Sequence, residues 1–294
     1  MSFDSLTEIV ERCDQRNLPF WQVIMDDDCE ERNVNREESG EQMSRMWEAM
    51  LHASDAYQTK DHSYSGLSGG DGGKMEQYLK KGHSICDPFM GEVIMEALKM
   101  GESNACMKRI VAAPTAGACG VLPAVLVPWF YHEKGTKKEM IQALYVSAGI
   151  GQVIAARASI SGARGGCQAE IGSASAMAAG ALVALSKGTP EQIIHAAAIA
   201  LKGLLGLVCD PVAGLVEVPC IKRGVIGAVN AMSSADMALA GITSRIPPDQ
   251  VIDAMQEIGD KMDASLKETA LGGLAATSAG MEARVKFEEM MQNE

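Results

Sequence analysis

The strongest constraint on the fold is a long run of small and apolar residues that lacks a polar face. Residues 171–185 read IGSASAMAAGALVAL, a stretch without a charged side chain. A helix that is apolar nearly all round must be buried, because it offers no face to water. We therefore expect this segment to lie between other helices in one compact core.

The composition of the 294-residue chain supports the same interpretation. There are 30 Gly and 19 Met, whereas aromatic residues make up only 4%. Small residues let helices approach closely and Met fills irregular gaps, while strands favour Val, Tyr and Phe. The predicted fold class is all-α, mainly helical, with Ala- and Gly-rich packed helices and Gly-rich loops.

Periodicity and turn residues predict how the chain is organised. We expect a helical extension or docking arm over residues 1–60 and a main helical domain over residues 61–294. The acidic run at residues 25–31 reads as a solvated turn. Helices are expected at residues 5–16, 37–57, 75–81, 90–106, 139–159, 169–186, 191–207, 225–239, 249–262 and 266–279.

The charge balance excludes several classes of partner. The chain has 26 Lys and Arg against 38 Asp and Glu, a net charge of -12. This charge repels nucleic acid and anionic lipid. The uncharged stretch at residues 110–131 is broken by Pro114, Pro123 and Pro128 and reads as a buried loop and helix. The N-terminus lacks the pattern of a secretory signal, so we expect a cytoplasmic protein.

Two Gly-rich turns are candidates for binding a small anion. The first, SYSGLSGGDGGK at residues 63–74, lacks the Gly and Ser/Thr spacing of a Walker loop. Its backbone N–H groups, placed before a helix, would suit a carboxylate. The second turn, APTAGACGVLP, occupies residues 113–123. Both also fit a purely structural role, because such turns are frequent in any fold.

Three of the eight cysteines lie beside turn-forming residues. Cys167 follows Gly165-Gly166, Cys209 precedes Asp210-Pro211, and Cys220 follows Pro219. Backbone N–H groups in turns can donate to the sulfurs of an iron–sulfur cluster, whereas buried cysteines are also common as packing residues. The residues alone leave both interpretations open. Packing is the interpretation for the other five, Cys13, Cys29, Cys86, Cys106 and Cys119.

Four segments taken together carry a resemblance to a known family. SGLSGGDGGK, APTAGACGVLP, GARGGCQAEIGSASAMAAG and GLVCDPVAGLVEVPC resemble the α-chain of iron–sulfur-dependent L-serine dehydratases. Enzymes of that family convert L-serine to pyruvate and ammonia without pyridoxal phosphate. The resemblance runs from about residue 60 to the end of the chain, and the combination of motifs is far more specific than any one of them.

The resemblance implies a cofactor and a substrate site. Cysteines with these neighbours hold a [4Fe-4S] cluster, and the spacing of Cys167, Cys209 and Cys220 matches the family. The chain ends without a cysteine, so one iron is expected to stay open and to act as a Lewis acid on the β-hydroxyl of serine. The residues implied to bind substrate are Ser68, Gly69, Gly70, Thr115, Ala116 and Gly117.

The resemblance also implies a partner, because family members pair this chain with a β subunit or carry both regions in one polypeptide. The catalytic base is unassigned and is expected on that partner if this chain lacks it. His83 is a weak candidate, Arg164 a candidate for orienting the substrate carboxylate, and His195 reads as a core residue. Three alternatives stay open: an L-cysteine desulfidase, a non-catalytic helical scaffold and a pyridoxal phosphate enzyme.

Overall fold

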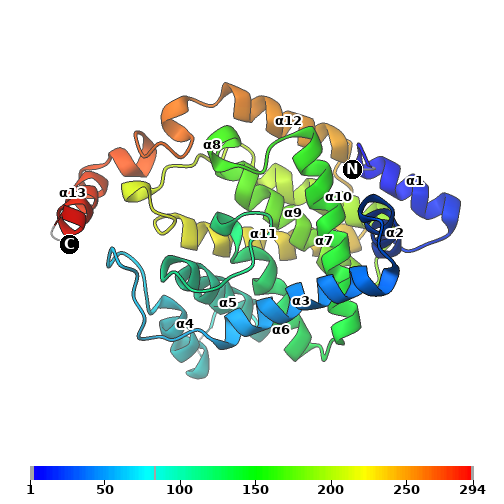
Figure 1. The fold of residues 1–294 in the computed structure, drawn as a ribbon, viewed down its shortest axis with the longest axis horizontal. Coiled ribbons are helices and arrows are strands. Elements are labelled where there is room, and N and C mark those ends of the chain that lie inside the picture. The colour runs from blue at the N-terminus through cyan, green and yellow to red at the C-terminus, as the bar shows by residue number, and fades with distance from the viewer. Residues whose placement is uncertain (1–2, 83, 293–294) are drawn as a thin grey trace.

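The computed structural model describes residues 3–82 and 84–292 and consists of helices joined by loops (Figure 1). The α-helices are α1 Leu6–Arg16, α2 Phe20–Arg32, α3 Arg36–Asp55, α4 Asp71–Lys80, α5 Pro88–Ala105, α6 Val121–His132, α7 Lys137–Arg157, α8 Gly162–Gly165, α9 Ser173–Leu185, α10 Pro190–Leu204, α11 Cys220–Leu239, α12 Pro248–Lys261 and α13 Ser278–Gln292. Over the described residues there is no strand, only an isolated bridge between Cys209 and Lys267. The predicted all-α fold is confirmed.

Shorter helical turns connect these helices. The 3-10 turns are η1 Ala116–Ala118, η3 Val212–Gly214, η4 Ala264–Leu266 and η5 Gly273–Ala276. The segment η2, Gln168–Gly172, is a π-helix that leads directly into α9. A π-helical turn is rare and is often found at functional sites. Three of the five turns, η1, η2 and η3, lie within the motifs that carry the family resemblance, whereas η4 and η5 follow the last of them.

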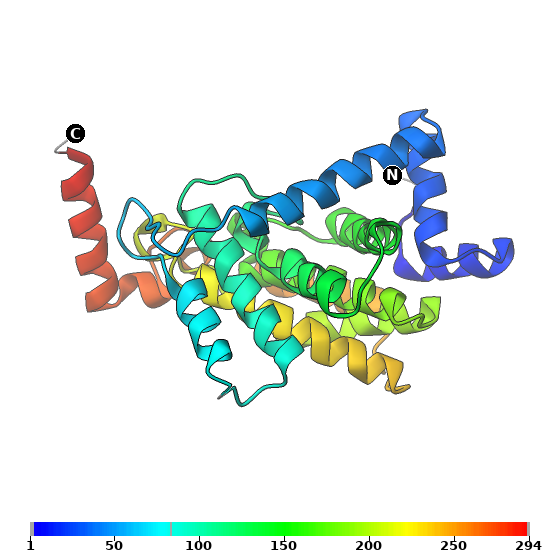
Figure 2. The same cartoon turned by 90° about the horizontal axis from the view of Figure 1, so that it is seen from below.

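Helix α9 lies at the centre of the fold, packed against α6, α7, α10 and α11 (Figures 1 and 2). Every residue of α9 except Ala184 is buried. The close approach depends on small side chains, because a Cβ on Gly180 would come within 2.2 Å of Ile150 Cδ1 on α7. The burial predicted for residues 171–185 is confirmed, and this helix connects the core to the segment that carries Cys167.

Helix starts follow the capping signals in the sequence. Thr136 and Thr189 each form a capping box, with Glu139 and Gln192 respectively, at the starts of α7 and α10. Pro190 occupies the first turn of α10. Backbone N–H groups in the first turn have no acceptor within the helix, so a proline there costs no intrahelical hydrogen bond. These local signals explain why both helices begin within two residues of their predicted starts.

The acidic run at residues 25–31 differs from its prediction, since it lies inside α2. Asp26 is buried and accepts hydrogen bonds from Arg16, at 2.5 Å, and from Arg36, at 2.8 Å. Buried carboxylates are retained when cations pair with them. The interpretation as a solvated turn was wrong because local charge density does not show that arginines from α1 and α3 converge on α2.

The predicted helix at residues 266–279 was also wrong. The structure has η4 and η5 there, and α13 begins only at Ser278. The backbone N–H of Cys209 donates to the Leu266 carbonyl at 2.8 Å, and the Glu268 N–H donates to the Cys209 carbonyl at 2.7 Å. Backbone groups that form these long-range bonds are not available to a local helix.

The apolar stretch at residues 110–131 forms a loop followed by α6, which confirms its interpretation. The first eight residues of α6, from Val121 to Pro128, are buried in the protein. Among the helices that the structure describes, none has the length and apolar character needed to cross a membrane.

The contact between α5 and the start of α6 generates a stability prediction. A Cβ on Gly120 would lie 2.9 Å from the backbone carbonyl oxygen of Ala97, which cannot rotate away. We expect Gly120→Ala to lower the free energy of unfolding by about 1–3 kcal/mol. Gly224→Ala in α11 is the matched control, because no atom lies within 4 Å of its added Cβ. Urea denaturation should show no loss of unfolding free energy for Gly224→Ala. Equal losses in the two variants would contradict the prediction.

Candidate functional site

The three cysteines that carry the family resemblance lie at neighbouring ends of three helices that pack on one another. Cys167 precedes η2 and α9, Cys209 follows the end of α10, and Cys220 is the first residue of α11. All three are buried. Because α9, α10 and α11 contact each other, residues far apart in sequence meet at one end of the core.

The three thiols influence one another electrostatically. Burial raises the pKa of each thiol from 9.0 to about 12. The next contributions include the other thiols: Cys220 acts on Cys167, Cys167 on Cys209, and Cys209 on Cys220, raising the pKa each time. Without a metal the three groups are therefore neutral thiols at pH 7.

A cation not identified from the sequence lies beside this group of thiols. Arg223 lowers the pKa of Cys167, Cys209 and Cys220 and hydrogen-bonds to the first of them. Its guanidinium also donates to the Val208 carbonyl at 2.7 Å and lies 2.8 Å from Asp210 Oδ1. One turn of α11 separates Arg223 from Cys220, so the i, i+3 spacing was the available signal.

The second Gly-rich turn adjoins the thiols. Ala116 and Gly117 line the same small cavity as Cys220, together with Cys119 and Asn104. The Asn104 side chain donates to the Ala116 carbonyl at 3.3 Å, which holds the turn against α5. The structure thus places the predicted substrate turn against one of the predicted ligands.

Glu170, on the π-helix η2, joins this turn to the thiols. Thr115 Oγ1 donates to Glu170 Oε1 at 2.7 Å. Burial raises the pKa of Glu170, while the hydrogen bond from Thr115 lowers it. This carboxylate acts on the pKa of all three thiols. Sequence reasoning missed it, since an acid next to a cysteine in an Ala-rich segment carries no distinctive spacing.

The first Gly-rich turn is held next to Cys220 by a buried carboxylate. Glu217 accepts a hydrogen bond from Ser63 at 2.6 Å and another from Ser65 at 2.8 Å. The loop closes through the Ser63 N–H, which donates to the carbonyl of Ser68 at 2.9 Å. Both turns proposed for substrate are thereby attached to the segments that carry the thiols.

The start of α4 provides an anion site, as the Gly-rich sequence suggested, but the anion comes from the protein. Glu102 of α5 accepts hydrogen bonds from the Asp71 N–H at 2.6 Å and the Gly72 N–H at 3.1 Å. Tyr57 donates to the same carboxylate at 2.6 Å. A substrate carboxylate must therefore use N–H groups other than these two.

The donor set fits an iron–sulfur cluster better than a single ion. Over residues 3–82 and 84–292, no three His, Cys, Asp or Glu side chains have the geometry of a single-ion site. In an iron–sulfur cluster each cysteine binds a different iron, so the thiolates lie further apart. Three buried cysteines beside one guanidinium are donors of the type that holds such a cluster, and the N-terminus of α11 favours the thiolate form of Cys220.

The remaining candidates divide into three outcomes. His83 lies outside the described residues. His195 is half-buried on α10; its Nδ1 accepts the Ser244 N–H at 3.3 Å, and partial burial lowers the pKa of its imidazole. Arg164 is exposed on α8. Its role toward a substrate carboxylate stays a prediction.

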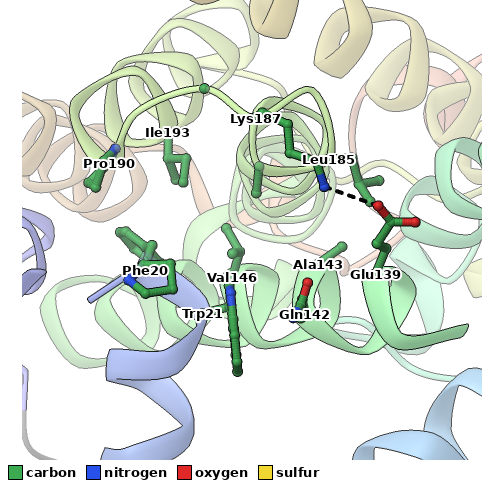
Figure 3. Close-up of a pocket in the computed structure, with 13 residues that line it drawn as sticks. Phe20, Trp21, Glu139, Gln142, Ala143, Val146, Leu185, Lys187, Pro190 and Ile193 are labelled. Atoms are coloured by element: carbon green, nitrogen blue, oxygen red, sulfur yellow. Dashed lines mark hydrogen bonds and ion pairs between the residues drawn. The ribbon is translucent and has the colours of Figure 1, made fainter. Parts of the chain in front are cut away.

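A second cavity, of about 200 Å³, lies among α2, α7, α9 and α10 (Figure 3). Its wall is mainly apolar, with Phe20, Val146 and Ile193 facing the space. The exposed ion pair between Lys187 and Glu139 lies at its edge. None of the three site cysteines lines it, so the cavity is separate from the thiol site.

Comparisons with known proteins show the family to which the chain belongs. The serine dehydratase alpha chain family matches residues 15–275, and the chain belongs to that family. The chain is 46% identical to a probable L-serine dehydratase alpha chain of Bacillus subtilis, covering 97% of this chain and 95% of that protein. It is 41% identical to the L-serine dehydratase alpha chain of Peptoniphilus asaccharolyticus, covering 95% and 96%.

A longer relative is also similar. An L-serine dehydratase of Escherichia coli is 36% identical over 93% of this chain, but the match covers only 61% of the Escherichia coli protein. The resemblance to the serine dehydratases is thereby confirmed.

The bonds around Glu102 generate a prediction for the α4 start. Glu102→Gln leaves a single acceptor oxygen where the carboxylate offers two, and we expect the free energy of unfolding to fall by about 1–3 kcal/mol. Glu76→Gln is the control, because the ion pair of Glu76 with Lys80 lies at the surface. Equal losses in the two variants, measured by urea denaturation, would contradict the structural role of Glu102.

The raised thiol pKa values predict how the metal-free protein responds to alkali. Burial raises the pKa of Cys167 from 9.0 to about 12 in the folded chain. The neutral thiol therefore contributes fully to the free energy of unfolding below pH 9.0, and this contribution is lost as the pH rises toward 12. The loss is about 1.4 kcal/mol per pH unit. Urea midpoints between pH 8 and 10.5 should fall less steeply for Cys167→Ala than for wild type. An equal fall of the urea midpoint with pH in wild type and Cys167→Ala would contradict the raised pKa of Cys167.

Proposed function

We propose that this chain is the cluster-bearing subunit of an L-serine dehydratase, a lyase that forms pyruvate and ammonia from L-serine. Its family membership and its relatives named as L-serine dehydratases support the reaction. The observation that carries the proposal is the grouping of Cys167, Cys209 and Cys220 next to the turn at Thr115. A scaffold protein has no need to bury three coupled thiols beside a cation.

The three cysteines would hold a [4Fe-4S] cluster as thiolates. When bound, the cluster supplies a Lewis acid for the β-hydroxyl of serine through an iron without a protein ligand. Binding requires the loss of three protons from thiols that burial keeps neutral. Arg223 favours that ionisation, because its positive charge lowers the pKa of each thiol.

The role of the two turns is to bind and orient serine. Backbone N–H groups at Ser68–Gly70 and Thr115–Gly117 would hold the substrate carboxylate, which makes the Cα proton easier to remove as negative charge develops nearby. Loss of this proton and of the hydroxyl gives aminoacrylate, which tautomerises to an imine that water converts to pyruvate and ammonia.

A β subunit completes the enzyme in this proposal. The alpha-chain names of the relatives imply a second chain, and the longer Escherichia coli relative has additional sequence beyond the matched region. No histidine of the described residues is assigned as the base, and we place the base on the partner, with His83 as the alternative in this chain. The complex would work in the cytoplasm, where reducing conditions maintain free thiols such as the eight found here.

The proposal is tested with protein reconstituted anaerobically with iron and sulfide and combined with its β subunit. We expect about four irons per chain and pyruvate formation from serine. Iron binding and pyruvate formation should both be lost in each of the variants Cys167→Ala, Cys209→Ala and Cys220→Ala. The matched control is Cys13→Ala in α1, which removes a buried thiol far along the chain from these three cysteines.

Three outcomes would overturn parts of the proposal. Retention of four irons in the Cys167→Ala variant would refute the ligand assignment. Faster turnover of L-cysteine than of L-serine by the fully loaded wild type would replace the dehydratase by a desulfidase. Loss of iron in the Cys13→Ala control would show that any buried thiol affects the cluster indirectly.

A further inference from the structure

The architecture of the site leaves space for one carboxylate, that of Glu170. A Cβ on Gly117 would lie 3.0 Å from Glu170 Oε1, and a Cβ on Gly162 would lie 2.6 Å from Oε2. These glycines come from two separate segments, the turn before α6 and the helix α8. A side chain at either glycine would displace the carboxylate, so both segments need glycine there to accommodate Glu170.

The same carboxylate lies next to the thiols. The Cβ position of Gly162 that meets Glu170 Oε2 is also 3.1 Å from Cys209 Sγ. The backbone of Glu170 belongs to η2, which begins one residue after Cys167. Its side chain therefore extends from the segment of one thiol toward another, between the cysteines and the predicted substrate turn.

Glu170 lacks a cationic partner among the described residues. Oε1 accepts a hydrogen bond from Thr115, a neutral hydroxyl, and the charge that acts most on the carboxylate is the like charge of Glu268. The nearby cation, Arg223, is paired with Asp210 instead. Partly buried charges are normally paired, so this carboxylate is suited to a positive charge that arrives with a ligand.

L-Serine brings such a charge, since its α-amino group is an ammonium at neutral pH. We propose that Glu170 binds the α-ammonium of the substrate and so selects amino acids over hydroxy acids. This inference rests on the proposed function. The hydrogen bond from Thr115 holds Oε1, while Oε2 faces the ammonium beside the thiols, and the substrate carboxylate is left to the backbone N–H groups of the turns.

The test compares two ligands that differ in the amino group. L-Serine and 3-hydroxypropanoate share the carboxylate and the β-hydroxyl, but the second has no ammonium. Because the anaerobic, cluster-loaded complex consumes L-serine, the affinity for serine is taken from its KM and that for 3-hydroxypropanoate from its inhibition constant, alongside iron content. The variants are Glu170→Gln, Glu170→Asp and, as a matched control, Glu268→Gln, which removes an exposed carboxylate that also acts on the site.

For Glu170→Gln we expect serine to bind at least about 10-fold more weakly, while 3-hydroxypropanoate binds within twofold of wild type and iron content is unchanged. Glu170→Asp keeps the negative charge and should recover part of the serine affinity. Glu268→Gln should leave the ratio of the two affinities unchanged.

Two results would overturn the role of Glu170 alone: an equal loss of affinity for both ligands, or loss of iron in both Glu170→Gln and Glu170→Asp. The first would show general damage to the site, and the second a structural or cluster-binding role. If the loaded wild-type complex neither binds L-serine nor forms pyruvate from it, the proposed function itself fails, whatever the variants do.

Discussion

Close packing of α9 against α10 and α11 is the constraint on which the site depends. These helices approach one another because their contact faces consist largely of Ala, Gly and Ser, and α9 is almost wholly buried. Cys167 lies before the first of them, Cys209 after the second and Cys220 at the start of the third. Packing of these helices therefore fixes the positions of their ends, and the three cysteines lie at those ends.

The fold could be predicted from the sequence, and the three cysteines were singled out there as candidate ligands, for different reasons. Residues 171–185 predicted a buried helix because no polar face exists along them, and capping residues such as Thr136 and Thr189 marked where helices begin. The cysteines stood out only through their neighbours, as part of a resemblance. Their meeting in space follows from helix packing, which periodicity does not describe. The division of the chain at residue 60 stays a prediction.

The parts that sequence reasoning missed all depend on contacts between distant segments. Glu102 reaches the start of α4 from α5, so an anion site that looked open is satisfied internally. Arg223 and Glu170 acquire their importance only when α11 and η2 meet at the thiols. The failed helix at residues 266–279 has the same cause, because its backbone bonds to Cys209. Local patterns carry no information about such partners.

The connection between the Cys209 loop and the C-terminal region affects when the protein matures. Cys209 bonds through its backbone to Leu266 and Glu268, and the neighbouring Asp210 accepts the Leu274 N–H at 2.8 Å. During synthesis these bonds form only after the segment at residues 266–274 has left the ribosome. Earlier nascent chains contain all three thiols without the segment that holds the middle one in place. Placement of the Cys209 thiol is thereby tied to synthesis of the segment at residues 266–274.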